Sequence, residues 1–196
     1  MSALPLNRKH YYTLEEYFAL ERVGETRYEY WDGEIVCMSG GSLEHGDISS
    51  NIHLLLGNHL KGKTCRAYTE GQAIKVPQLL PYRYLDASVV CGDIHRETIG
   101  GIEAITNPTI LVEVVSPDSK ERDTKIKCAA YQNIPSLREY LIIEQESPTV
   151  TLYTRTENDI WHKEIIVGLE KSFRLSSIEC QVEMVDVYEN VSFSKE

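Results

Sequence analysis

The sequence lacks any run of about 18 apolar residues, the length that a membrane-crossing helix needs, so we expect no transmembrane segment. Its first residues, MSALPLNRKHYYTLEEYF, contain neither the apolar stretch nor the small-residue cleavage site of a secretory signal. CxxC pairs are absent, and the cysteines lie 28, 26, 37 and 52 residues apart. We therefore predict five reduced thiols and a cytoplasmic location.

Several widespread motifs are also absent. The chain contains no P-loop, GxGxxG, GxSxG or HExxH pattern, which excludes the common signatures of NTPases, dinucleotide-binding enzymes, α/β-hydrolases and zinc proteases. No repeat or Gly/Ser-rich linker divides the 196 residues. We expect one domain over residues 1–196, a size that buries roughly 70% of its unfolded surface without a structural metal.

Positive charge is in short supply. Lys and Arg total 20 against 30 Asp and Glu, for a net charge of −10, and a nucleic-acid-binding protein normally has a basic face. The acidity is concentrated at the two ends, because residues 1–56 sum to −5, residues 57–143 to +1 and residues 144–196 to −6. The middle of the chain therefore remains compatible with weak, salt-sensitive binding to nucleic acid.

The residue pattern predicts an α/β (α+β) fold with mixed strands and two principal helices. A capping box from Thr13 to Glu16 opens a short helix that extends to about residue 19. The pair Asp32–Gly33 between two apolar runs predicts an N-terminal hairpin. We expect further helices over residues 45–60 and 119–132, and strands over 65–76 (one bulged strand), 83–91, 110–115, 139–143, 150–154, 160–167 and 173–175, the last four as a C-terminal meander.

Two acidic residues interrupt apolar strands. Glu113 lies within ILVEVV and Asp86 within YLDASVV, and a charge in a central strand is costly unless it is paired or bound to a metal. If the two strands are neighbours, both carboxylates can point to one spot, and two rigid carboxylates are a usual way to hold Mg²⁺. The alternatives are a Glu113–Arg pair and an Asp86 that caps a turn.

Three further residues are candidates for the same site. Lys127 follows Asp123 by one helical turn, and its ammonium could position an attacking water and offset charge on a phosphate. Glu29 could add a third carboxylate, or could be an exposed strand residue beside Arg27. His45 begins the long helix, where it could meet a phosphate or serve as an ordinary surface residue.

Glu29, Asp86, Glu113 and Lys127 lie in motifs that resemble the Uma2 family of restriction-endonuclease-like proteins, which belongs to the PD-(D/E)XK nuclease superfamily. The resemblance covers about residues 12–155. It is carried by YEYWDGE at 28–34, LDASVV at 85–90, LVEVVSP at 111–117 and KCAAYQNIPSLREY at 127–140.

The resemblance implies a mixed central sheet flanked by helices and a Mg²⁺- or Mn²⁺-dependent DNA endonuclease. In it Asp86 and Glu113 would be the metal ligands, Lys127 the catalytic cation and Glu29 an additional acid. Leu85 stands where the superfamily usually has Pro, and Val115 where it has the lysine of E-x-K, so Lys127 would have to supply that cation from the following helix.

A homodimer is expected, because one small domain has one site and duplex cleavage needs two. The alternatives are a degenerate nuclease fold that acts as a binding or assembly module, and an enzyme that acts on RNA or another phosphodiester.

Overall fold

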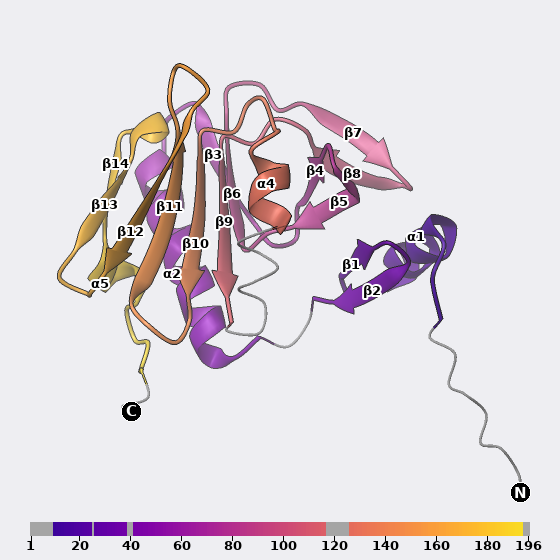
Figure 1. The fold of residues 1–196 in the computed structure, drawn as a ribbon, viewed down its shortest axis with the longest axis horizontal. Coiled ribbons are helices and arrows are strands. Elements are labelled where there is room, and N and C mark those ends of the chain that lie inside the picture. Colours follow the sequence, from indigo (N-terminus) through magenta and orange to yellow (C-terminus); the bar gives the residue numbers. More distant parts are fainter. Residues whose placement is uncertain (1–9, 25, 39–40, 117–125, 194–196) are drawn as a thin grey trace, which may run out of the picture.

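The computed structural model describes residues 10–24, 26–38, 41–116 and 126–193. Its largest sheet has six strands in the order β12-β11-β10-β9-β6-β3 (Figure 1). Only β9 and β10 are parallel among these neighbours, and the other pairs are antiparallel. The predicted mixed sheet is thus confirmed. Of the four strands expected as a C-terminal meander, β10 to β12 form one, whereas the stretch 173–175 lies in β13 (Ser172–Leu175), which pairs with β14 (Cys180–Glu183) in a separate two-stranded sheet. The strands are β3 (Cys65–Thr69), β6 (Ala87–Cys91), β9 (Ile110–Val115), β10 (Glu139–Glu144), β11 (Thr149–Arg155) and β12 (Trp161–Val167).

Strand β9 lies inside this sheet, and all six of its residues are buried. Ile110, Val112 and Val114 pack with α2 (Leu43–Leu60), β13, β14 and α5 (Met184–Val187) on one face. Leu111 and Val115 pack with α4 (Cys128–Tyr131) on the other. Side chains alternate along a strand, so Glu113 lies on the α4 face with Leu111 and Val115.

A second sheet of four strands packs beside the first. Its order is β5 (Leu79–Tyr84), β4 (Ala73–Val76), β8 (Ile102–Ile105) and β7 (Arg96–Ile99). Buried residues of β4, β5 and β8 contact α1 (Leu14–Val23) and the hairpin of β1 (Tyr28–Trp31) and β2 (Glu34–Cys37). No pattern in the sequence predicted β7, β8, β14 or α5.

Local signals at the N-terminal end are confirmed. Thr13 and Glu16 form the reciprocal capping box, although α1 extends to Val23 rather than to residue 19. Asp32 and Gly33 have φ values of 46° and 94°. Positive φ at both central residues is what a tight two-residue hairpin turn requires.

Two predicted strands are wrong because the chain passes from one sheet to the other within them. The stretch 65–76 forms β3 in the large sheet and β4 in the small one. The stretch 83–91 is interrupted at Leu85 and Asp86, between β5 and β6. Of the helix expected over 119–132, the described residues contain α4, and residues 117–125 lie outside the description.

One prediction about the cysteines is also wrong. Cys65 and Cys91, which are opposite each other on β3 and β6, form a disulfide, while Cys37, Cys128 and Cys180 are free thiols. Within the described ranges, no helix has the length and apolar content to cross a membrane.

Candidate nuclease site

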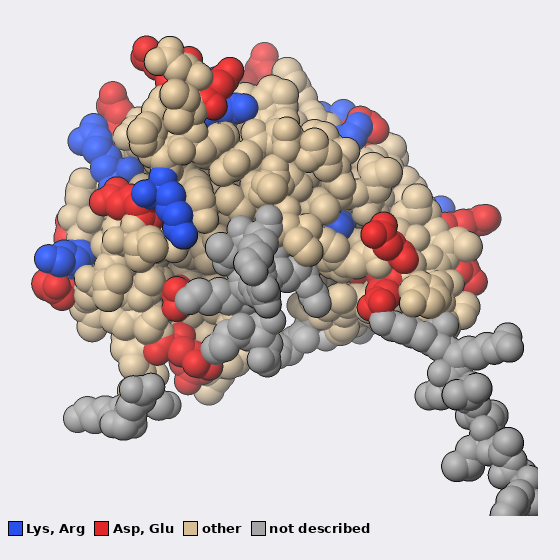
Figure 2. All heavy atoms as spheres, viewed as in Figure 1, with Lys and Arg blue, Asp and Glu red and all other residues tan. Residues whose placement is uncertain are grey.

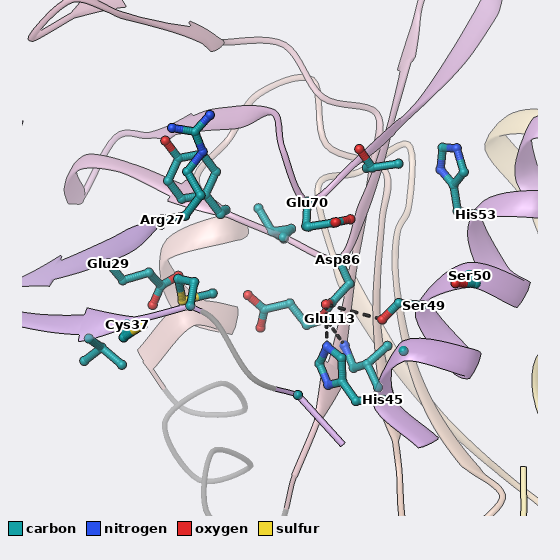
Figure 3. A pocket seen from close by; sticks show the side chains of 18 of the residues that line it. Arg27, Glu29, Cys37, His45, Ser49, Ser50, His53, Glu70, Asp86 and Glu113 are labelled. Carbon is teal, nitrogen blue, oxygen red and sulfur yellow. Dashed lines mark hydrogen bonds and ion pairs between the residues drawn. The ribbon is translucent and has the colours of Figure 1, made fainter. Parts of the chain in front are cut away.

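A cavity of about 880 Å³ lies where the two sheets, α2 and the β1–β2 hairpin meet (Figure 3). Glu29 and Cys37 contribute to it from the hairpin, and His45 and Ser49 contribute from α2. The lining also contains all four of the residues predicted from the sequence: Asp86, Glu113, Lys127 and Glu29. Residues that are up to 98 positions apart in the chain are therefore gathered around one space.

Asp86 reaches this space because it lies in the crossover from β5 to β6, not within a strand. One carboxylate oxygen, Oδ2, accepts a hydrogen bond from the backbone amide of Val114 at 2.7 Å. Since Val114 directly follows Glu113 on β9, this bond attaches Asp86 to the strand that carries Glu113, and both acids line the cavity. The other oxygen, Oδ1, lies 2.8 Å from His45 Nε2 and 3.4 Å from Ser49 Oγ.

Glu113 is held in a buried polar cluster. Its Oε1 accepts hydrogen bonds from Lys127 Nζ at 2.8 Å and the Tyr131 hydroxyl at 2.9 Å, and its Oε2 accepts from the Tyr140 hydroxyl at 2.8 Å. These contacts explain how a charge persists in a central strand, because a buried carboxylate needs both a counter-ion and hydrogen bonds. Burial, together with the charge of Glu113, raises the pKa of Tyr131, so this hydroxyl remains a donor.

Lys127 joins this cluster to the hairpin. Its ammonium lies 3.3 Å from Glu29 Oε1, an oxygen that has no hydrogen bond within the described part of the chain. The other Glu29 oxygen accepts a hydrogen bond from the Trp31 indole at 3.1 Å. Asp123, the partner that the sequence suggested for Lys127, lies outside the described residues.

Several contacts around the site are not predicted from the sequence. His45 is a candidate for contact with a phosphate, and its contact with Asp86 is unexpected. Arg83 is fully buried with its guanidinium 4.2 Å from the Trp31 ring, and this burial lowers its pKa. Tyr131 follows Lys127 by four residues, a spacing that places both on one side of a helical turn and was a usable signal.

The side chains that line the cavity offer the type of ligand atom, carboxylate oxygen, that a divalent cation prefers. The cavity is lined by four carboxylates, those of Glu29, Glu70, Asp86 and Glu113, which provide hard oxygen donors. Among the described residues, no group of three or more acidic, His or Cys side chains is arranged to enclose a metal. Mg²⁺ is usually held by one or two carboxylates, with water and substrate phosphate completing its shell, so Asp86 and Glu113 are sufficient in number.

Comparison with known proteins identifies the family. The profile of the Uma2 family, described as "Putative restriction endonuclease", matches residues 14–184. The chain belongs to the Uma2 family. Two uncharacterized proteins of Synechocystis are relatives: slr1290 is 31% identical over 181 residues, covering 91% of this chain and 92% of that protein. The second, sll1609, is 27% identical over 149 residues and covers 76% and 84% of the two chains.

A solved structure supports the fold of this Uma2 protein. The crystal structure of a protein from Anabaena variabilis, described as a "putative nuclease belonging to DUF820", superposes with a TM-score of 0.68. It is 19% identical and covers 84% of this chain and 91% of its own. The agreement shows a shared restriction-endonuclease-like fold, with the mixed sheet that the sequence predicted.

Proposed function

We propose that this Uma2 protein is a Mg²⁺- or Mn²⁺-dependent DNA endonuclease that hydrolyses a phosphodiester bond in the cavity around Asp86 and Glu113. The observation that carries the proposal is the meeting of these acids, Glu29 and Lys127 around one cavity. Family membership supports the reaction class.

In this proposal each residue has one task. Asp86 and Glu113 would hold the divalent ion, which when bound supplies a Lewis acid for the phosphate and a more acidic water. Lys127 keeps a positive charge beside Glu113, where it would offset the charge that develops on the phosphate. Glu29 keeps Lys127 in place and would contribute a third carboxylate near the ion.

The surface charge limits how DNA would be held. Figure 2 shows acidic and basic side chains interspersed on the described part of the face seen in Figure 1, without a broad basic surface. Binding would therefore depend on the metal and would be weak, because few Lys and Arg side chains are available to neutralise phosphates. We also propose that one domain provides one site, that a homodimer cuts both strands, and that the protein acts in the cytoplasm.

The test is cleavage of supercoiled plasmid, single-stranded DNA and RNA by the purified protein in Mg²⁺, Mn²⁺ or EDTA. We expect metal-dependent DNA cleavage, and at least about a 100-fold loss in Asp86→Asn, Glu113→Gln and Lys127→Met. Glu164→Gln is the matched control, because Glu164 is an exposed residue of another strand of the same sheet. Light scattering of the same sample gives the oligomeric state.

Cleavage that persists in Glu113→Gln would contradict the assignment of the site. Cleavage of RNA in preference to DNA would show that RNA, and not DNA, is the substrate. No cleavage of any of the three, together with no Mn²⁺ binding by calorimetry, would favour the binding or assembly module.

A further inference from the structure

The α2 wall of the cavity holds Asp86 from the side opposite β9. His45 Nε2 lies 2.8 Å from Oδ1, and Ser49, one turn further along α2, has its hydroxyl 3.4 Å from the same oxygen. The remaining oxygen accepts from the Val114 amide. Hydrogen-bond donors from α2 and β9 therefore fix the orientation of the Asp86 carboxylate (Figure 3).

The position of His45 is itself fixed by the start of α2. The hydroxyl of Ser42, the N-cap residue, accepts a hydrogen bond from the His45 amide at 3.2 Å. Gly41 lies directly against the imidazole, since a Cβ at that position would be 3.1 Å from the ring carbon Cδ2 and 3.2 Å from Cγ. A residue without a side chain is needed here for the ring to remain where it is.

We infer that His45 is a positioning residue, which holds Asp86 in the orientation in which that carboxylate would bind the divalent ion. The inference rests on the proposed function and adds a residue to its site. Partners of metal-binding carboxylates orient the ligand, and their loss typically lowers metal affinity 10- to 100-fold. His45 acts through Asp86 and contacts the reacting groups only by way of it.

The same helix provides a matched control. His53 also lies on α2 and lines the same cavity. Its Nδ1 is buried without a hydrogen-bond partner in the described part of the chain, and its ring has no contact with Asp86 among the described interactions. Both histidines therefore lie on the same helix and line the same cavity, but His45 contacts Asp86 and His53 does not in the described structure.

The first measurement is Mn²⁺ affinity by titration calorimetry for the wild type, His45→Ala, His45→Gln and His53→Ala. We expect His45→Ala to weaken binding by about 10- to 100-fold and His53→Ala to leave it unchanged. His45→Gln retains an N–H donor at a similar reach, so it should recover most of the affinity. Wild-type affinity in His45→Ala would overturn the inference. A loss in His45→Gln as large as in His45→Ala would also overturn it, because the imidazole would then be a ligand itself.

A second variant leaves the imidazole intact. Gly41→Ala requires the ring to move by a few tenths of an ångström, so we expect a smaller loss of Mn²⁺ affinity in the same direction as for His45→Ala. Circular dichroism shows whether each variant is folded. If His45→Ala does not fold, Gly41→Ala and His45→Gln carry the test, and wild-type affinity in Gly41→Ala would then overturn the inference.

A metal-free readout separates this inference from the proposed function. The Val114 amide donates to Asp86, so its ¹⁵N–¹H resonance and its hydrogen exchange report how that carboxylate is held. We expect the resonance to shift and exchange to accelerate in His45→Ala, with no change in His53→Ala. If the wild type binds no Mn²⁺, the proposed function fails, whereas an unchanged Val114 amide in His45→Ala shows that His45 does not hold Asp86.

Discussion

The two sides of the cavity hold their acids in different ways. The Glu113 side chain is 5% exposed and is surrounded by Lys127, Tyr131 and Tyr140. The Asp86 side chain is 18% exposed, and its partner His45 is 28% exposed. The side around Glu113 is therefore part of the core, while the side around Asp86 faces the cavity.

This difference predicts different consequences of substitution. Removing a member of a buried ion cluster leaves an uncompensated charge, which costs stability as well as activity. Removing a partly exposed partner leaves a group that water can reach, so stability changes little. Substitutions around Glu113 should consequently lower the free energy of unfolding more than substitutions around Asp86, even where both kinds of substitution abolish activity.

The largest effect is expected for Lys127→Met. It leaves Glu29 and Glu113 buried without the ammonium that contacts both, and we expect the free energy of unfolding to fall by about 3–5 kcal/mol. Urea unfolding followed by circular dichroism measures this. Lys75→Met is the matched control, because Lys75 pairs with Glu97 at the surface and its loss should cost at most about 1 kcal/mol. Equal stability of the two variants would show that the ion pairs of Lys127 contribute no more to the free energy of unfolding than a surface pair.

The next effect concerns the strand that follows Asp86. The Cys65–Cys91 disulfide joins β3 to β6 across a sequence separation of 26 residues, and its reduction should lower the free energy of unfolding by roughly 3–4 kcal/mol. The double variant Cys65→Ser/Cys91→Ser should show the same loss. Thiol titration of the denatured, unreduced protein should find three free cysteines, and a count of five would contradict the disulfide.

A smaller effect is expected for Tyr140→Phe. The Tyr140 hydroxyl donates to Glu113 Oε2 at 2.8 Å, and loss of a hydrogen bond to a buried charge costs about 1.5–3 kcal/mol. Tyr153→Phe is the control, because the Tyr153 ring stacks on Tyr140 with centroids 6.0 Å apart and its hydroxyl does not contact Glu113 in the described structure. If both variants lose the same free energy of unfolding, the hydrogen bond from Tyr140 to Glu113 contributes no additional stability.

Local patterns in the sequence predicted much of this architecture. The capping box at Thr13 and the Asp32–Gly33 turn depend on neighbouring residues, and the structure contains both. The burial of Glu113 in a central strand followed from six consecutive β-type residues, five of them apolar. Such features need no knowledge of distant contacts.

The remaining features depend on tertiary contacts. The chain leaves one sheet for the other at Asp86, and nothing in YLDASVV distinguishes a crossover from a continuous strand. The contact between His45 and Asp86 joins residues 41 positions apart, and a single histidine at a helix start does not indicate its partner. The pairing of Cys65 with Cys91 likewise requires the register of β3 and β6.

The indole of Trp31 gives this protein an internal optical reporter. It donates to Glu29 and lies under the Arg83 guanidinium, so its emission will respond to changes in charge three contacts away, at Glu113. The chain has two tryptophans, and the other, Trp161, is on β12 beneath Arg155. In a Trp161→Phe background, the fluorescence of one residue would follow events in the buried side of the cavity without any added label.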